Sequence, residues 1–467
     1  MMEEKLPKGW RSKSLQNVLS FVIGGDWGKD PNDISEEDYV QVAVIRGSEI
    51  KNWRKDKGST ASIRVIKQNS LEKRNLIEGD ILIEISGGGP DQPVGRVILI
   101  DEDTLSQNSN LPKIGTNFLR LLRANQKLIN APFLNYYLTF FYLSGKVIEY
   151  QGGSNNLRNL KYKEFEKIQI PHPPLTEQHR IVAKLDVLFG HLDSLREKLD
   201  RIPALLKNFR QQVLTQAVTG ELTKEWREEE KIENKNGPIP IPESWSFRQL
   251  KELSISLKYG SSSKSLNLGD VPVLRMGNIQ EGEIDWSDLK YSSDQIEIGK
   301  YKLTAGDLLF NRTNSPELVG KTAIFRGDRE AVFAGYLIQV KPKDSINSEF
   351  LNFVLNSNYA KKWCWEVKTD GVSQSNINAK KLGDFIVPFP SLDEQLEIVS
   401  KVNSLFEISK RIESQYHSLK TKIDQLPQAI LAKAFLGELV SQEVKEYVVE
   451  KIEGLMAAEG EEGYGIE

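Results

Sequence analysis

The sequence contains an internal repeat, and this repeat limits the possible fold more than any other feature. The segment PHPPLTEQHRIVAKLDVLF begins at Pro171, and PFPSLDEQLEIVSKVNSLF begins at Pro388. The match continues without a gap to TGEL at residues 219–222 and LGEL at residues 436–439. Chance does not produce a gapless match of this length, so we expect two related halves built from the same structural unit.

A more divergent block precedes each repeated segment. Four further matches define it: Trp10 with Trp245, residues 45–50 with 274–279, residues 78–85 with 305–312, and residues 133–138 with 350–355. Each half should therefore hold a globular block of roughly 150 residues, a usual size for one domain. A segment of about 50 residues then follows each block, and these two segments are more similar to each other than the blocks are. They are called the better-kept segments below.

The better-kept segments carry a heptad pattern. Their apolar residues recur in alternating steps of four and three, which is typical of paired helices in a coiled coil. The first seam is Ile181, Leu185, Leu188, Leu192, Leu195, Leu199, Ile202, Leu206, Phe209 and Val213, and the second is Ile398, Val402, Leu405, Ser409, Ile412, Tyr416, Leu419, Ile423, Leu426 and Ile430. Two seams with a globular block between them favour an antiparallel pair. The alternative, in which each helix packs on its own globular block, stays open.

Residues at the ends of these segments predict where the helices begin, bend and end. The signals are Thr176 and Asp393 as caps of the first turn, Gly220 and Gly437 as C-terminal stops, and Pro203 and Pro427 as breaks or kinks.

One stretch, VGKT at residues 319–322, resembles the end of a phosphate-binding loop. Such a loop needs G-x-x-x-x-G-K-[ST] and opens a helix. Ser315 stands where the first glycine should be, and VGRVILI at residues 94–100 holds the same place in the first half without the motif. We therefore expect a turn that enters a strand rather than an ATP site.

Composition narrows the class of protein. The single cysteine, Cys364, excludes a disulfide framework, and the four histidines lack zinc-site spacing. No apolar run is long enough to span a membrane, and the first residues lack the apolar stretch of a signal peptide, so we expect a cytoplasmic protein. The net charge of −3 is not typical of a nucleic-acid-binding protein, but many of the acidic residues lie at the end of the chain.

The duplicated blocks, the P-x-P-[PS]-L-x-E-Q-x-x-I-V motif and the GEL endings together resemble the specificity subunits of type I restriction–modification systems. The segment TDGVSQSNINAKKLGDFIVPFPSLDEQ at residues 369–395 is especially similar to the end of a target recognition domain. The first copy, at residues 151–178, has Leu157 where Gln374 stands in the second. The resemblance covers the chain up to about residue 440.

The resemblance implies an α+β fold. Two globular mixed α/β target recognition domains are separated by two long helices that pair as an antiparallel coiled coil, with a pseudo-two-fold internal repeat. The expected boundaries are residues 1–170 for target recognition domain 1, 171–222 for helical region 1, 223–242 for a linker, 243–387 for target recognition domain 2, 388–440 for helical region 2, and 441–467 for an acidic tail.

The resemblance also implies a subunit that is not itself an enzyme. Each domain would read one half of a split, asymmetric site in double-stranded DNA, while the helices set the gap and dock two methyltransferase subunits. Restriction subunits would join the assembly. S-adenosylmethionine, ATP and Mg would be bound by those partners and no cofactor by this chain. The nearest string to a methyltransferase [DNS]-P-P-[YFW] loop, HPPL at residues 172–175, lacks both key residue types. A protein scaffold without DNA readout is the competing interpretation.

Polar and basic loop residues are the candidates for DNA contact, because base edges and phosphates are bound by such side chains. In the first half they are Arg46, Lys51, Arg54, Lys55, Lys57, Gln92, Arg96, Asn155, Asn156 and Arg158; in the second they are Tyr259, Ser261, Ser262, Ser263, Lys264, Arg275, Asn278, Arg312, Asn314, Lys321, Gln374, Ser375 and Asn376. Arg46 and Arg275 share one context and could equally support a turn.

Four tryptophans and four helix residues complete the candidates. Trp53, Trp286, Trp363 and Trp365 could stack at DNA, although core positions are the commoner role for tryptophan. For contact with partner subunits we favour the residues repeated near the helix starts, with local capping as the alternative: Gln178, Lys184, Gln395 and Lys401.

Overall fold

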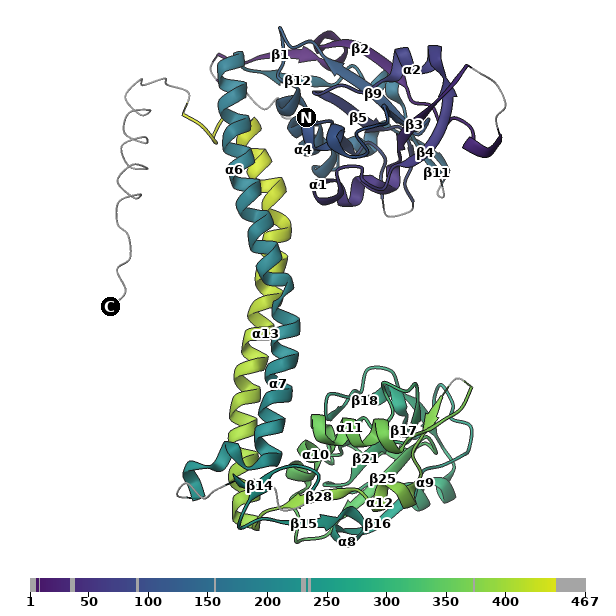
Figure 1. The fold of residues 1–467 in the computed structure, drawn as a ribbon, viewed down its shortest axis with the longest axis vertical. Coiled ribbons are helices and arrows are strands. Elements are labelled where there is room, and N and C mark those ends of the chain that lie inside the picture. Colours follow the sequence, from purple (N-terminus) through teal and green to yellow (C-terminus); the bar gives the residue numbers. More distant parts are fainter. Residues whose placement is uncertain are drawn as a thin grey trace. The chain divides into compact units, whose positions relative to one another are not determined.

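The computed structural model describes residues 6–7, 9–33, 38–89, 92–154, 157–227, 232–233, 237–372 and 374–441. The chain divides into two compact units. Unit 1 combines residues 1–197 with 420–467, and unit 2 comprises residues 198–419. Each unit contains one mixed α/β domain together with neighbouring parts of the long helices (Figure 1).

Each unit is built around a four-stranded antiparallel sheet, and the strand order is the same in both. In unit 1 the order is β2 (Leu19–Gly24), β9 (Leu119–Ala124), β5 (Asp80–Glu84) and β7 (Val97–Leu99); in unit 2 it is β16 (Ser254–Tyr259), β25 (Leu337–Pro342), β21 (Leu308–Asn311) and β23 (Thr322–Ile324). Strands β5 and β21 are buried along their whole length, which suits their nearly continuous apolar runs. Both edge strands, β2 and β16, carry a bulge near their start.

A second, three-stranded sheet contains one parallel pair in each unit. It is β4 (Ser62–Lys67), β3 (Tyr39–Ile45) and β8 (Lys113–Gly115) in unit 1, and β20 (Lys290–Ser292), β17 (Val271–Leu274) and β24 (Val332–Phe333) in unit 2. Its apolar residues supply further buried core in both units.

Smaller pairings recur as well. In each unit a hairpin and one short strand make a small three-stranded sheet. In unit 1 the hairpin strands are β10 (Gln151–Ser154) and β11 (Leu157–Leu160), and the short strand is β6 (Ser86–Gly87). In unit 2 the hairpin strands are β26 (Thr369–Asp370) and β27 (Ser375–Asn376), and the short strand is β22 (Thr313–Asn314). Next to the long helices, β1 (Arg11–Ser14) pairs with β12 (Gln169–His172), and β15 (Ser246–Gln249) pairs with β28 (Ile386–Phe389). The strand pairings thus confirm the internal repeat.

Short helices complete each domain. In unit 1 they are α1 (Trp53–Asp56), α2 (Gln68–Arg74), α3 (Glu102–Ser106), α4 (Ala131–Leu143) and α5 (Tyr162–Phe165); in unit 2 they are α8 (Leu250–Leu253), α9 (Gln295–Tyr301), α10 (Ser348–Asn356), α11 (Asn358–Val367) and α12 (Ala379–Gly383). Asn130 and Asn347 cap α4 and α10 through their side-chain oxygens.

The long helices are α6 (Leu175–Asp200), α7 (Ile202–Thr219) and α13 (Leu392–Phe435). A break at Arg201 separates α6 from α7, and Pro203 lies in the first turn of α7, where its missing N–H costs nothing. Pro427 lies inside α13, which continues through it. Of the two predicted breaks, therefore, only the one at Pro203 divides a helix.

The helices pair antiparallel within each unit. In unit 2, Arg210 of α7 contacts Glu413 of α13, whereas the later residue Leu222 accepts a hydrogen bond from the earlier Lys401. In unit 1, Arg196 of α6 lies 3.8 Å from Asp424, and the earlier residue Arg180 bonds the later Ser441. The opposite direction of the numbering at both ends confirms the predicted orientation (Figure 1).

The alternative packing is also partly realised, because the helices contribute to the domain cores. In unit 2 Val213 and Val218 of α7 and Ile398 and Val402 of α13 share one buried cluster with Phe350 of the domain. Part of the predicted seam does not bury: its exposed members are Leu195, Ile412, Leu419 and Leu426. Among the described residues, no helix has the length and apolar character needed to cross a membrane.

The predicted caps at Thr176 and Asp393 are wrong, because both helices begin before these residues. Helix α6 begins at Leu175 and α13 at Leu392, so both residues lie inside the first turn. Ser391 precedes α13, and its hydroxyl accepts the backbone N–H of Glu394 at 3.3 Å. The C-terminal stops are confirmed, because Gly220 and Gly437 adopt positive φ values of 77° and 75°.

The VGKT stretch is a turn that enters a strand, as predicted. Strand β23 begins at Thr322, and no helix follows Gly320. Gly320 has a φ of 94°, and a Cβ there would lie 2.5 Å from the Cys364 sulfur. Its counterpart Gly95 has a φ of 111° and similarly little space beside Val147. Glycine is therefore required here by backbone conformation and close packing.

Candidate nucleic-acid interface

One glutamine in each unit joins the domain to the start of a long helix. Gln178 accepts the backbone N–H of Asn130 at 2.8 Å and donates to the carbonyls of Leu128 and Pro173. Gln395 repeats all three bonds, with Asn347 at 2.7 Å, Ser345 and Pro390.

Both glutamine side chains are completely buried, with an exposed fraction of 0%. Their amides are occupied within the chain, so neither presents a surface to a partner subunit. The expectation of partner contact at Gln178 and Gln395 is corrected accordingly, and the alternative of local packing fits both residues.

A tryptophan and a glutamate form a second repeated joint. The indole N–H of Trp10 donates to Glu177 at 3.1 Å, and that of Trp245 donates to Glu394 at 2.8 Å. Glu394 also accepts from Thr223 at 2.8 Å and forms a buried ion pair with Arg227. The internal repeat matches the two tryptophans with each other and the two glutamates with each other, but the sequence does not show that tryptophan and glutamate are in contact.

The two lysines predicted to bind partners differ in their surroundings. Lys184 is exposed on α6, and no described residue bonds its ammonium group. Lys401 donates to the carbonyl of Leu222 at 3.2 Å and lies 3.7 Å from Glu397. Lys184 therefore remains a predicted partner contact, whereas Lys401 already links α13 to the segment after α7.

Arg46 and Arg275 support equivalent turns. The backbone N–H of Arg46 donates to Glu49, and the Arg46 guanidinium binds the same buried carboxylate at 2.7 Å. The backbone N–H of Arg275 donates to buried Asn278, and its guanidinium binds Asp288 at 3.0 Å. Asn278 further donates to two backbone carbonyls. These contacts favour the structural role that the sequence had left open for both arginines.

The basic stretch before residue 58 divides into bound and free cations. Arg54 pairs with Asp193 of α6 at 2.9 Å and lies over the Phe189 ring at 5.0 Å, and Lys57 pairs with Asp101. The ammonium groups of Lys51 and Lys55 have no bonding partner among the described residues, and both side chains are exposed. DNA contact thus stays a prediction chiefly for Lys51 and Lys55.

Arg96 is bound inside unit 1 rather than presented at its surface. Its guanidinium forms two hydrogen bonds with buried Glu84, at 2.6 and 2.9 Å, and a third with the Gly47 carbonyl. Burial disfavours the charge of Arg96, but the hydrogen bonds that it donates to Glu84, and the charge of that carboxylate, outweigh burial and raise the pKa of Arg96. With its amide turned, Gln92 also accepts from Arg96.

The matching site in unit 2 has no carboxylate. Asn311 replaces Glu84, is fully buried, and has neither side-chain atom hydrogen-bonded. Lys321, which replaces Arg96, donates instead to Gln280 at 3.1 Å. The two predicted basic contacts at this turn therefore differ, since only Lys321 is held by a neutral partner.

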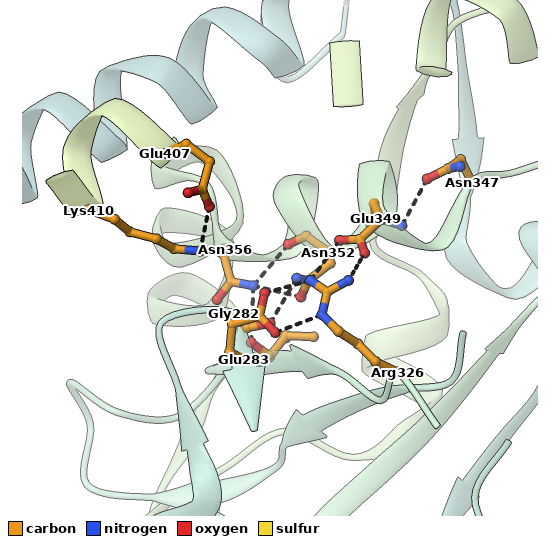
Figure 2. A network of polar contacts seen from close by, with 10 residues as sticks. Gly282, Glu283, Arg326, Asn347, Glu349, Asn352, Asn356, Glu407 and Lys410 are labelled. Atoms are coloured by element: carbon orange, nitrogen blue, oxygen red, sulfur yellow. Dashed lines mark hydrogen bonds and ion pairs between the residues drawn. The ribbon is translucent and has the colours of Figure 1, made fainter. Parts of the chain in front are cut away.

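A polar network fixes the loop between β18 (Ile279–Gln280) and β19 (Glu283–Ile284) against α10 (Figure 2). Arg326 binds Glu283 through two hydrogen bonds and also pairs with Glu349. The hydrogen bonds that Arg326 donates to Glu283, and then those to Glu349, raise the pKa of Arg326. Asn352 donates to the Gly282 carbonyl at 2.9 Å. The network therefore holds this loop on α10 inside the domain, and its cation, Arg326, is already paired with two carboxylates.

Five predicted residues of unit 2 come together from separate segments. Arg312 lies over the Tyr259 ring at 4.6 Å, and its Nη2 donates to Asn376 at 3.4 Å. Asn376 donates to Thr313 at 2.7 Å, and the backbones of Asn314 and Ser375 pair in the short sheet. Ser375 is buried and donates to Asp370, and a hydrogen bond from Lys368 lowers the pKa of that carboxyl group. Gln374 stands exposed beside this cluster.

The serine-rich loop after β16 presents most of its predicted residues. Ser262, Ser263 and Lys264 are exposed. Ser261 is buried, donates to Glu297 of α9, and accepts the backbone N–H of Ser263 at 3.0 Å. Ser261 therefore holds the loop in place, while the next three residues remain available to a ligand.

The hairpin of unit 1 carries the remaining candidates. Arg158 is half-buried on β11 and faces Gly87 across the short sheet. The predicted loop candidates Asn155 and Asn156 lie outside the described residues.

Three of the four tryptophans belong to the core, as the commoner role predicted. Trp53 is 7% exposed, and Trp286 and Trp363 pack against the buried clusters of unit 2. Trp365 is 57% exposed, with Lys368 over its ring at 4.3 Å.

The loop after β2 was missed. Gly25 and Gly260 make the same backbone contacts, so the segment Asp26–Lys29 matches the serine-rich loop of unit 2. Trp27 is 36% exposed there and lies 4.7 Å from the guanidinium of Arg64. The internal alignment, extended to these two glycines, would have added this loop to the candidates.

Side chains that could bind a metal ion do not gather in the described part of the chain. It contains no cluster of three His, Cys, Asp or Glu placed to hold a metal ion. Burial raises the pKa of the Cys364 thiol to about 12. What the described residues do bring together is arginine, asparagine, serine and tyrosine, which recognise by hydrogen bonding and stacking.

The family model of the Type I restriction modification DNA specificity domain matches the sequence twice, at residues 7–204 and 242–418. The Type I restriction enzyme EcoKI specificity subunit of Escherichia coli (strain K12) is 31% identical over 453 residues, which cover 95% of this chain and 92% of that protein. The StySPI specificity subunit of Salmonella potsdam is 30% identical over 452 residues, with the same coverage.

Two solved structures share the fold. A chain from work on complex assembly and conformational transition of the type I R-M system has a TM-score of 0.65 at 20% identity, covering 93% of this chain and 99% of its own. The HsdS subunit from Thermoanaerobacter tengcongensis has a TM-score of 0.57 at 21% identity, covering 93% and 98%.

Proposed function

This chain belongs to the family of type I restriction–modification specificity subunits, and from that premise we propose how its two domains divide the work. Each domain reads one half of a bipartite, asymmetric DNA site. The observation that carries this proposal is the repeat itself. The joints at Gln178 and Gln395 are the same bond for bond, whereas the polar side chains near the hairpins differ between the units.

Two different reading surfaces on one repeated framework suit an asymmetric site. The cluster of Tyr259, Arg312 and Asn376 in unit 2 has no residue-for-residue copy in unit 1, where Gly24 and Ile85 hold the first two positions. Polar side chains of this kind bind base edges in the major groove. The exposed cations Lys51, Lys55 and Lys264 supply contacts to phosphates, which orient a protein on DNA without reading sequence.

We further propose that the helices α6, α7 and α13 set the gap between the half-sites and dock two methyltransferase subunits. The exposed flank that includes Lys184 is available for this. Catalysis then belongs to the partners. Methyltransferase subunits bind S-adenosylmethionine, restriction subunits bind ATP and Mg, and this chain binds no cofactor. The assembly works in the cytoplasm, on double-stranded DNA.

A long-read map of methylated adenines, made with and without this gene, tests the proposal. Loss of one split motif on deletion is the expected result, and it names both half-sites. An unchanged map in a strain that expresses the methyltransferase would overturn DNA readout by this chain. The competing scaffold without DNA readout would then gain support.

A further inference from the structure

Arg312 of unit 2 is a half-buried cation without a carboxylate. It stacks on Tyr259, which is 40% exposed, and among the described residues no Asp or Glu pairs with it. Its two hydrogen bonds, from Nη1 to the Gly335 carbonyl and from Nη2 to Asn376, are both 3.4 Å long. The usual length is about 2.9–3.0 Å, so both bonds are weak and easily exchanged.

Most donors of Arg312 are unused. A guanidinium has five N–H groups. Nε of Arg312 is buried without a partner, and each Nη has a second N–H that no described residue accepts. A buried donor without an acceptor costs stability, and such groups are exceptions that call for a ligand or water. Contact with the Tyr259 ring, 4.6 Å from the guanidinium carbon, limits the positions that the side chain adopts.

Unit 1 contains a second arginine of this kind, which the sequence did not single out. Arg120 of β9 is half-buried and lies over the Tyr162 ring at 4.1 Å. Its side chain makes no hydrogen bond or ion pair with any described residue, and its Nε is buried without a partner. The hydroxyl of Tyr162 is likewise buried and unpartnered.

The two stacks occupy matching places in the repeat. Arg120 faces Gly24 across the β2–β9 pair, and the matching position to Gly24 in unit 2 is Tyr259. Tyr162 begins α5, and its counterpart Ala379 begins α12, where its backbone N–H donates to the Tyr259 hydroxyl at 2.8 Å. Each unit thus places an arginine against a tyrosine ring, between the end of its edge strand and this short helix. Arg120 comes from β9, and Arg312 is the residue after β21.

We propose that Arg312 and Arg120 are specificity-determining residues, and that each binds a guanine in the half-site read by its own unit. The inference rests on the proposed function. Two parallel N–H donors in one plane match the O6 and N7 acceptors of guanine, which is the commonest specific contact of arginine with a base. A phosphate also accepts two such donors, but contact with it carries no sequence information, so loss of discrimination at a single base separates the two ligands. Tyr259, Tyr162 and Asn376 act as positioning residues.

The test is the map of methylated adenines from strains that carry Arg312→Gln or Arg120→Gln in place of the natural gene. Each variant should lose discrimination at one guanine of one half-site, about 5- to 150-fold for a bidentate contact, and leave the other half-site unchanged. Arg312→Lys and Arg120→Lys should show the same loss, because lysine keeps the charge but lacks the planar pair of donors.

Matched controls are Arg248→Gln in unit 2 and Arg11→Gln in unit 1. Both are exposed arginines on the equivalent strands β15 and β1, and neither change should alter the motif. An unaltered motif in either Gln variant, or a uniform loss of methylation that lysine restores, would overturn guanine reading.

Failure of the proposed function gives a different result from failure of this inference, because the strain with the natural gene would then show no split motif of methylated adenines. Should a Gln variant methylate nothing, the Lys variant of the same arginine decides, since it keeps the cation on its tyrosine. Relaxation at a base other than guanine would also overturn the inference.

Discussion

Replacing Glu394 by glutamine removes one negative charge from the buried joint that it forms with Trp245, Thr223 and Arg227. The side chains of Glu394 and Arg227 are each 3% exposed. One carboxylate oxygen accepts from Thr223 and Arg227, and the other accepts from Trp245 at 2.8 Å. Glutamine has the same shape, but it offers a single acceptor oxygen and brings an amide N–H₂ toward groups that are themselves donors.

The size of the effect follows from burial. Breaking a buried ion pair by neutralising one partner costs about 3–5 kcal/mol, because the other charge stays buried. For units of this size, 1 kcal/mol shifts the midpoint of thermal unfolding by about 2–4 °C. We therefore expect the transition of unit 2 to fall by roughly 6–12 °C in Glu394→Gln, from the lower end of that cost.

The repeat provides the matched control, Glu177→Gln. Glu177 is half-buried, and Trp10 is its only bonding partner among the described residues, at 3.1 Å. No arginine joins this joint, so the cost should be close to that of one hydrogen bond, about 1 kcal/mol. Unit 1 should then lose only about 2–4 °C.

Scanning calorimetry combined with hydrogen exchange of peptides from the starts of α6 and α13 distinguishes the two units, which need not unfold together. The reasoning predicts faster exchange at residues 392–401 in Glu394→Gln and nearly normal exchange there in Glu177→Gln. Equal shifts in the two variants, or none in Glu394→Gln, would refute the argument from the buried ion pair.

Two further predictions use the same pairing of positions. Gln178→Ala and Gln395→Ala should each destabilise their own unit by about 1–3 kcal/mol, since each leaves buried backbone groups unpaired, and unequal losses measured by hydrogen exchange would contradict the shared bonds. Burial first, and then repulsion by Lys13, lower the pKa of His172. Protonation is thus easier in the unfolded chain, whose histidine pKa is about 6.5, so unit 1 should lose stability as the pH falls below that value. Denaturant unfolding at pH 7 and pH 5 should show a smaller loss in His172→Phe, the residue type found at Phe389 in unit 2; an identical loss would contradict it.

The helices and the repeat were predictable because their signals are periodic or duplicated. Alternate steps of four and three specify a helix face, and a gapless match specifies equal folds. The helix starts were less certain. The prolines before Thr176 and Asp393 suggest a cap at each, but both helices begin two residues earlier than such caps imply, at Leu175 and Leu392. Helix ends depend on local backbone geometry, which composition alone does not determine.

The roles of individual cations were not predictable, because each depends on a partner distant in the sequence. Arg96 is neutralised by Glu84, which lies on the neighbouring strand, and Arg54 by Asp193 of α6. Arg120 is the reverse case. It stands in an apolar strand and resembles a structural residue, yet no carboxylate among the described residues pairs with it. Tertiary pairing, and not residue type, decides which arginines remain available to DNA.

The joints explain how two domains can diverge while their attachment stays constant. Every bond of Gln178 and Gln395 goes to a backbone N–H or carbonyl, and one of the three positions that supply these groups differs between the units, with Leu128 in unit 1 and Ser345 in unit 2. A backbone partner is present whatever side chain the position carries. That position on the domain side of the joint therefore tolerates substitution while the bond from the glutamine is kept. A reading surface can then change its side chains, from Gly24 to Tyr259 for example, without loosening the domain from the helix that positions it.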